Sequence, residues 1–354
     1  MRVLEYKVSF TTPAFLGNAE QQAQWRTPPF KALLRQWWRV AYSADQTGRL
    51  DVARLRAAEG RLFGVAADGG DSRKSQIRIR LERWSIGRLT SWGTLDSERV
   101  AHPEVKSRDG RPAPVGAQLY LGYGPLEFAG GQTSLKARAA IQAGEVAKLS
   151  MAFPLESEAH RLDIALLLMH HYGTLGGRSR NGWGSFSLTP ANLNTPVLDG
   201  ALDDSLTVPW QKALELDWPH AIGRDARGPL IWQTAPLDDW KSAMRRLAEI
   251  KIGLRTQFKF TTGRDAAQPE ARHWLSYPVT NHTVREWGNN ARLPNSLRFK
   301  VRVERNGKLR GVIFHVPCLP PPRFRPDREV VMGVWTRVHE FLGHPAQALQ
   351  RISS

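Results

Sequence analysis

Lys31, Arg35 and Arg39 recur at four-residue intervals in the segment 28–42. Residues four apart lie on the same face of an α-helix, so this spacing predicts a single basic stripe. The segment holds no acidic residue, and Trp38 lies beside the stripe. Because three like charges at this spacing repel one another, we expect an anion such as phosphate to lie against them. A solvated helix face is the alternative interpretation.

A second candidate is the glycine-rich loop 173–184, which contains two arginines. Glycine permits close approach of a ligand and leaves backbone amides available to phosphate. The loop follows a predicted helix and enters a predicted strand, which is the reverse of a dinucleotide-binding fingerprint. An ordinary glycine-capped helix end is the alternative. The loop residues predicted to contact nucleic acid are Gly176, Gly177, Arg178, Arg180, Asn181 and Trp183.

A third basic segment contains Arg73 and Lys74. Gly69 and Gly70 come shortly before these two residues, and a predicted strand follows them. This loop either contacts a nucleic-acid backbone or forms a surface turn. Trp25, Trp38 and Trp183 have basic neighbours. We therefore predict that these three rings are exposed and stack on bases.

The composition favours a polyanionic partner. The 354 residues carry a formal net charge of +17, and nucleic acid is the commonest polyanion that a surface this basic binds. A merely soluble or thermophile-like surface is the alternative, and an anionic membrane would require a lysine-rich amphipathic helix or a lipidation site that the sequence lacks. The single cysteine, Cys318, allows no intrachain disulfide. With no signal peptide or membrane span in the sequence, we expect a cytoplasmic protein that does not bind membranes.

Patterns for catalysis and metal binding are absent from the sequence. It has no cysteine pair and no His-Glu-x-x-His motif. His170 and His171 occupy adjacent helix positions that face different ways, so we expect them at a core edge or against RNA. We predict no metal, no cofactor and no enzymatic activity.

The predicted elements indicate an α+β fold. Strands are expected over 4–12, 76–86, 118–128, 145–153 and 183–188, and helices over 29–42, 51–62 and 160–172, with an irregular excursion over 90–116. Strand, helix, strand, strand, helix, strand is the order of a ferredoxin-like fold. The second half repeats this theme more loosely, with a helix over 237–260, a hairpin over 296–316 and a helix over 330–342. We expect one domain over 1–190, a linker over 191–207 and a second domain over 208–354.

Several motifs occur in the order found in the RAMP superfamily. They lie in segments 10–18, 26–39, 63–64, 72–75 and 175–185. In them the sequence resembles the family of first-numbered RAMP subunits of the type III-B CRISPR Cmr complex. The resemblance covers about the first 190 residues well and the second half loosely. After residues 15–17, where the family usually has glycines or small acidic residues, this chain has Asn18, Ala19 and Glu20.

The resemblance implies two tandem ferredoxin-like (RRM-like, βαββαβ) domains with long loop insertions. It also implies a non-nucleolytic subunit that holds guide RNA (crRNA), target RNA or both near the guide 3′ end in an antiviral ribonucleoprotein, beside other RAMP subunits. Carried over by position, the residues that contact RNA phosphate are Arg26, Lys31, Arg35 and Arg39 from the first helix and Arg178, Arg180 and Asn181 from the glycine-rich loop.

Two enzymes remain as alternatives. One is a metal-independent RAMP endoribonuclease that processes guide precursors, which requires a general base such as histidine. The other is a subunit that cleaves target RNA through a loop aspartate, for which Asp96 and Asp109 in the excursion are candidates.

Overall fold

The chain divides into two compact units in a computed structural model that describes residues 1–46, 50–66, 72–95, 98–154 and 159–352. Unit 1 comprises residues 1–95, 122–206 and 300–307, and unit 2 comprises residues 96–121, 207–299 and 308–354. The sequence-based division differs from these units in the two exchanged segments, 96–121 and 300–307, and in residues 191–206, which were expected in a linker and belong to unit 1. The predicted α+β class is confirmed, since helices alternate with several small antiparallel sheets.

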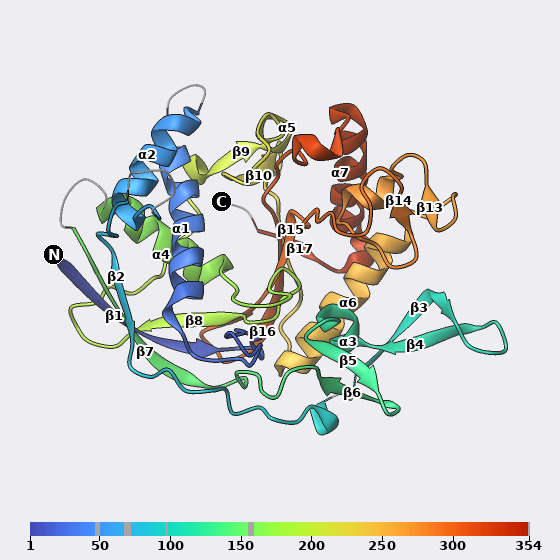
Figure 1. Cartoon of the computed structure of the whole chain (residues 1–354), viewed down its shortest axis with the longest axis horizontal. Helices are drawn as coiled ribbons and strands as arrows, with labels where there is room; N and C mark the ends of the chain where they lie inside the picture. Colours follow the sequence, from blue (N-terminus) through green and yellow to red (C-terminus); the bar gives the residue numbers. More distant parts are fainter. Residues whose placement is uncertain (47–49, 67–71, 96–97, 155–158, 353–354) are drawn as a thin grey trace. The chain divides into compact units, whose positions relative to one another are not determined.

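Unit 1 is built on a four-stranded antiparallel sheet with the order β2-β7-β1-β8 (Figure 1). The strands are β1 (Arg2–Phe10), β2 (Arg78–Leu81), β7 (Val146–Phe153) and β8 (Phe186–Pro190). Alternate residues of β1 are buried, from Leu4 to Phe10, because successive side chains of a strand point to opposite faces. One face of this sheet therefore forms the core of the unit.

Helices α1 (Thr27–Ala44) and α4 (Ala159–Tyr172) pack side by side and cover that core (Figure 1). The α1 helix begins where expected because Pro28 and Pro29 occupy its first turn, where proline costs no hydrogen bond. Phe30 of α1 contacts Phe186 of β8 edge-on. Helix α2 (Val52–Phe63) packs against α1 and is capped by Asp51.

Unit 2 contains a second four-stranded sheet, with the order β15-β16-β12-β17. Its elements follow one another as β12 (Ile231–Gln233), α6 (Trp240–Thr256), β15 (Leu297–Val303), β16 (Leu309–His315), α7 (Arg328–Gly343) and β17 (Gln350–Arg351). Numbered along the chain, both sheets have the order second, third, first, fourth. The end of β15, from residue 300 onward, belongs to unit 1.

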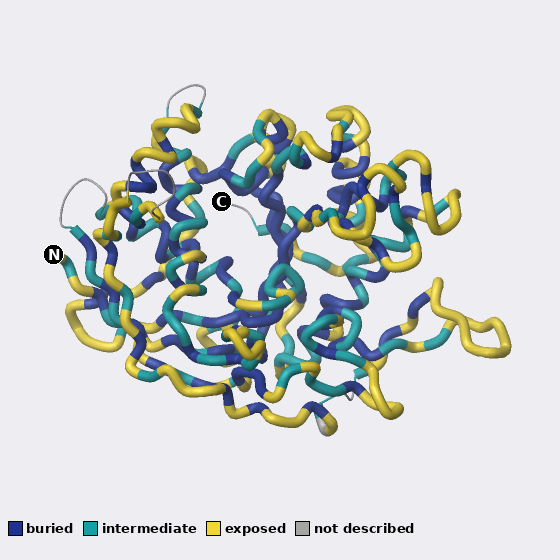
Figure 2. The backbone as a smooth tube through the Cα atoms, viewed as in Figure 1, coloured by how far each residue is buried: buried dark blue, intermediate teal, exposed yellow. Residues whose placement is uncertain are grey.

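The remaining elements are short. They are α3 (Ala117–Gly122), α5 (Trp210–Ala213), and the strands β3 (Arg99–Lys106), β4 (Pro112–Gly116), β5 (Leu126–Ala129), β6 (Gln132–Leu135), β9 (Thr207–Pro209), β10 (Ile222–Asp225), β11 (Gly228–Pro229), β13 (Asp265–Ala266) and β14 (Thr283–Val284). The tip of the β3–β4 hairpin is exposed (Figure 2).

Two sequence predictions of secondary structure are wrong. The expected strand over 118–128 begins as helix α3 and becomes a strand only in β5. The excursion over 90–116 is not irregular, because β3 and β4 pair as an antiparallel hairpin. The first segment is a short run whose periodicity does not separate helix from strand. The second is rich in glycine, proline and charge, which are typical of loops.

Candidate nucleic-acid interface

The basic stripe of α1 has an acidic partner inside the protein. Glu59 of α2 is only 3% exposed, and its carboxylate accepts hydrogen bonds from Arg35 Nε at 2.6 Å and Arg39 Nη2 at 3.0 Å. Burial raises the pKa of Glu59, but the hydrogen bonds and charges of Arg39 and Arg35 outweigh burial and hold the pKa below its usual value. The anion expected beside the stripe is therefore in part Glu59, which partly neutralises Arg35 and Arg39.

Lys31 differs from these two arginines, because no described acidic group forms an ion pair with it. Its side chain is half-buried, and burial, together with the charge of Arg35, lowers its pKa. Both effects destabilise the charged form of Lys31 in the isolated chain. A bound phosphate would offset them through its negative charge, so Lys31 is the member of the stripe best suited to bind an anion.

We expect Lys31→Glu to weaken RNA binding by several-fold while the melting temperature stays within a few degrees of wild type. Arg35→Glu should instead lower the melting temperature, because it places a second carboxylate beside buried Glu59. Fluorescence anisotropy and thermal unfolding of the two variants separate binding from stability. If Lys31→Glu binds RNA like wild type, the stripe serves only the fold.

The glycine-rich loop 173–184 is fixed by hydrogen bonds to the chain segment that follows β1. Gly177 N donates to Phe15 O at 2.9 Å, and Gly184 N donates to Pro13 O at 2.8 Å. Within the loop, Gly182 N donates to Ser179 O at 3.1 Å. The prediction that these glycines leave their amides available to phosphate is therefore wrong for Gly177, Gly182 and Gly184.

The glycines serve the path of the chain instead. Gly176 and Gly184 have positive φ angles of +93° and +64°. A Cβ atom would lie 2.6 Å from Phe15 O at Gly176 and 1.9 Å from Leu175 O at Gly184. Gly177 lies outside the left-handed region, and a Cβ there would come within 3.1 Å of the Pro125 side chain. Close approach of the protein's own backbone explains Gly176 and Gly184.

Arg178 is the exposed cation of the loop. It has a φ of +56°, a conformation that non-glycine residues rarely adopt. Its guanidinium lies over Gly124, where a Cβ would be 3.3 Å from Nη2. No described residue forms an ion pair or a hydrogen bond with its guanidinium, and burial lowers the pKa of Arg178. Arg180 and Asn181 are half-buried and already interact with other parts of the protein.

The three tryptophans predicted to stack on bases are buried. Trp25, Trp38 and Trp183 are each 0% exposed. Trp38 packs against Phe63 of α2, Trp183 packs against Phe15 and Trp92, and the Trp25 indole donates to the Glu145 carboxylate at 3.0 Å. The prediction is wrong because basic neighbours in the sequence do not report which side of an element faces solvent.

The other predicted contacts fall into two places in unit 1. Arg73 and Lys74 are exposed just after α2, where the backbones of Arg73 and Val65 pair; the glycines that precede them lie outside the described residues. Arg26 is half-buried, and its Nη1 donates to Gly17 O at 2.8 Å. Arg26 therefore contacts the segment 13–23, to which the glycine-rich loop is also bonded through Gly177 and Gly184.

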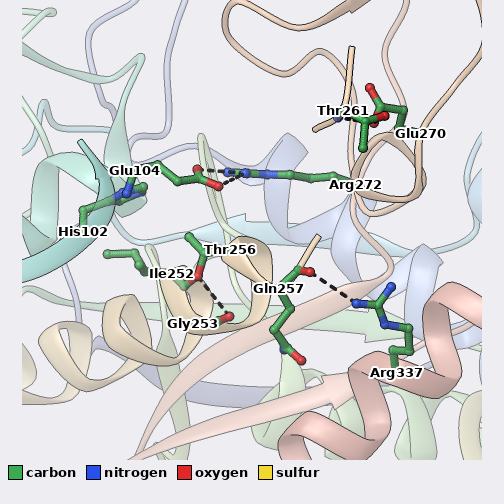
Figure 3. A network of polar contacts seen from close by, with 10 residues as sticks. All are labelled: His102, Glu104, Ile252, Gly253, Thr256, Gln257, Thr261, Glu270, Arg272 and Arg337. Atoms are coloured by element: carbon green, nitrogen blue, oxygen red, sulfur yellow. Dashed lines mark hydrogen bonds and ion pairs between the residues drawn. The ribbon is translucent and has the colours of Figure 1, made fainter. Parts of the chain in front are cut away.

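Unit 2 holds polar clusters that the sequence did not reveal. Figure 3 shows the Glu104 carboxylate accepting hydrogen bonds of 2.7 and 2.8 Å from Arg272, with His102 on the same strand. Burial lowers the pKa of His102.

A second cluster in unit 2 is a hydrogen-bonded chain. It runs from Ser296 Oγ to His315 Nε2 and from His315 Nδ1 to His339 Nε2, each at 2.9 Å. Only the three-dimensional fold brings these residues together.

Of the two candidate catalytic aspartates, Asp109 is the one that the structure describes. Asp109 is exposed near the tip of the β3–β4 hairpin, where it binds Ser107 and Arg111. Asp96 lies outside the described residues. In the part of the chain that the structure describes, no group of three His, Cys, Asp or Glu side chains could hold a metal ion, and none of the described helices is long and apolar enough to span a bilayer.

No family model matches the chain, and no curated protein matches it. Its structural neighbours include Cmr1 from Pyrococcus furiosus in the apo form, with 15% identity and a TM-score of 0.46 over 99% of this chain and 98% of that chain. They also include chains of the type III-B Cmr-beta complex. One is from the complex bound to cognate target RNA (11% identity, TM-score 0.45, 95% and 99% coverage). Another is from the complex bound to cognate target RNA and AMPPnP in the presence of single-stranded DNA. It has 11% identity and a TM-score of 0.47, over 96% of this chain and 99% of that chain.

Proposed function

We propose that this chain binds RNA without cutting it, as a cytoplasmic subunit of a type III-B CRISPR effector complex of the RAMP superfamily. In this role it holds guide RNA, target RNA or both near the guide 3′ end, beside other RAMP subunits, in antiviral defence. The observation that carries the proposal is Arg178, an exposed and unpartnered cation displayed in a left-handed conformation by the glycine-rich loop. The sequence resemblance over the first 190 residues supports the assignment to this complex.

The charge distribution supports an RNA partner. The net charge of +17 leaves many cations without an acidic partner in the sequence, and Lys31 and Arg178 are two whose surroundings in unit 1 provide none. Lys and Arg side chains that replace counterions on phosphates supply most of the affinity for a nucleic-acid backbone. Because Arg35 and Arg39 are partly neutralised by Glu59, we assign them a secondary role in binding.

We further propose that the two units are tandem ferredoxin-like domains. Each sheet is formed by strands that alternate with two helices in the order βαββαβ, and each has the same strand order. The β3–β4 and β5–β6 hairpins (Figure 1) are then insertions between the second and third strands of the first domain.

An endoribonuclease is the second candidate, and the chain from Ser296 through His315 to His339 is the one observation that favours it. Metal-independent cleavage of RNA needs a general base that can reach the attacking 2′-hydroxyl of the ribose. His315 and His339 are only 0% and 6% exposed. Buried histidines are better suited to a structural chain, so we retain the binding function.

Arg178→Gly tests the proposed function. Glycine accepts the +56° φ angle without strain, so the fold should be preserved while one phosphate contact is lost. We expect affinity for a single-stranded RNA to fall about tenfold or more at low salt. The slope of log affinity against log salt should decrease in magnitude by about 0.7. The RNA should remain intact in magnesium, manganese or chelator.

Arg325→Gly is the matched control, because Arg325 also has positive φ (+46°) but lies in unit 2 and pairs with Glu286. It removes the same charge and, like Arg178→Gly, places glycine at a position with a left-handed backbone conformation. Equal affinities for the two variants would reject Arg178 as a specific contact. RNA cleavage that disappears in His315→Gln would establish the enzyme instead.

A further inference from the structure

A cavity of about 770 Å³ opens in unit 1 beside the glycine-rich loop. It is lined by residues from segments 15–23, 124–125 and 135–139 and by Gly177. Its volume lies within the range of pockets that take small organic ligands, about 300–1,000 Å³. The cavity therefore has room for a group larger than a phosphate.

The walls of the cavity combine apolar and aromatic side chains. Phe15, Pro125 and Ala137 lie among the lining residues. The Phe15 ring packs against two buried rings. Its centroid lies 5.3 Å from that of Trp183 and 6.2 Å from that of Trp92. Such a wall is preformed and can receive a flat apolar face with little loss of side-chain entropy.

Two amide side chains at the cavity have no hydrogen-bond partner in the described part of the chain. They belong to Gln21 and Gln22, in a turn whose backbone is already satisfied: Gln21 N donates to Asn18 O at 3.1 Å and Gln22 N donates to Asn18 Oδ1 at 3.0 Å. Gln21 also has a φ of +62°, which the turn imposes. Amides can both donate and accept, as the edge of a nucleobase requires.

Cations outnumber acidic groups at the opening, where Glu20 is the acidic lining residue. Lys136 and Arg138 are exposed lining residues, and the Arg178 guanidinium lies over Gly124, another lining residue. Arg26 Nη1 donates to the carbonyl oxygen of Gly17, which is also a lining residue. Apolar walls, unpartnered amides and a cationic rim together fit a nucleotide with its base inside and its phosphates outside.

We propose that this cavity receives one unstacked nucleobase of a single-stranded RNA whose phosphates lie along Arg178, Lys136 and Arg138. The inference rests on the proposed RNA-binding function and adds a base-binding pocket to it. It predicts that affinity depends on the presence of a base as well as on backbone charge. Stacking and edge contacts to one base are worth about tenfold in affinity.

A thiol placed in the cavity tests this inference without disturbing folding. Cys318 is the only cysteine, so Cys318→Ala gives a thiol-free background. Ala137→Cys puts a thiol at a half-buried lining position, and Ala129→Cys puts one at an exposed position of β5 that does not line the cavity. Alkylation by a maleimide is then timed with no RNA, with a mixed-sequence 12-nucleotide RNA, and with an abasic 12-mer of the same backbone.

We expect the base-bearing RNA at saturation to slow alkylation at position 137 about tenfold, and the abasic RNA to slow it less than twofold. The rate of alkylation at position 129 should be the same without RNA, with the base-bearing RNA and with the abasic RNA. Once position 137 carries a bulky maleimide, affinity for the base-bearing RNA should fall to that for the abasic RNA, with the salt slope unchanged.

Equal protection by the two RNAs would overturn the proposal, because the backbone alone would then cover the opening. Binding of both RNAs without protection would also overturn it and leave the RNA-binding function intact. If neither RNA binds, both proposals are rejected. Protection that occurs only when protein partners are added, without RNA, would assign the cavity to a protein segment and overturn the proposal.

Discussion

Lowering the pH from 7 to 5 should reduce the free energy of unfolding of this protein by on the order of 5 kcal/mol. The reason is a pair of histidines in each unit, half-buried in unit 1 and buried in unit 2. In unit 1, burial lowers the pKa of His170 to about 3 and that of His171 to about 4, with Lys300 and Arg302 adding to the effect. In unit 2, burial lowers the pKa of His339 to about 3 and that of His315 well below its usual value.

The direction follows from proton uptake. In the unfolded chain these histidines titrate near pH 6.5, so below that pH the unfolded state binds more protons than the folded state. Their contribution to stability is complete above about pH 6.5 and is lost as the pH falls toward 3–4. Each fully shifted histidine contributes up to about 1.4 kcal/mol per pH unit.

Urea unfolding between pH 7.5 and 5 measures this loss. His339→Gln should flatten the profile, because glutamine keeps a hydrogen-bond acceptor for His315 Nδ1 and does not titrate. His160→Gln is the matched control, since His160 is exposed. Parallel profiles for the two variants would contradict the assignment of acid sensitivity to the buried pair.

Gly184→Ala should lower the melting temperature of unit 1 by roughly 6–12 °C, equivalent to about 3 kcal/mol. Two costs combine at this position. The added Cβ would lie 1.9 Å from Leu175 O, so the backbone must shift. The φ of +64° is also strained for alanine.

Gly144→Ala separates the two costs. Gly144 has a similar φ of +84°, but a Cβ there would have no atom within 4 Å. This variant should lose only the conformational part, about 1 kcal/mol. Differential scanning calorimetry of both variants gives the comparison. If they melt together, the close approach of Leu175 to Gly184 does not constrain the loop.

The sequence predicted those features that depend on short-range spacing. Helix α1 was located correctly because its prolines mark its start and because Phe30, Leu33, Leu34, Trp37 and Ala41 recur on one face, and all are buried. The hairpin of β15 and β16 was located by the Asn306-Gly307 turn. Such patterns arise within one element and need no knowledge of its neighbours.

What the sequence did not predict depends on contacts between distant elements. Glu59 is twenty residues beyond Arg39 in another helix, and only the packing of α2 on α1 turns its carboxylate toward the stripe. The same packing covers Trp38 with Phe63. The cavity likewise needs three segments that are far apart in the chain. Lys31 and Arg178 are predicted site residues whose charged groups have no partner among the described residues, a feature that a sequence cannot display.

The assignment of residues 300–307 to unit 1 has a consequence for how the protein is made. Lys300 is fully buried and donates to His170 O, and Val301 N donates to Ser185 Oγ at 2.9 Å. The ribosome finishes the rest of unit 1 at residue 206, yet these partners emerge only about a hundred residues later. At a synthesis rate of about 5–20 residues per second, His170 O and Ser185 Oγ therefore lack these donors for on the order of 5–20 s. An arrested ribosome–nascent chain exposing residues 1–206 should therefore be cut by protease faster than one exposing residues 1–320.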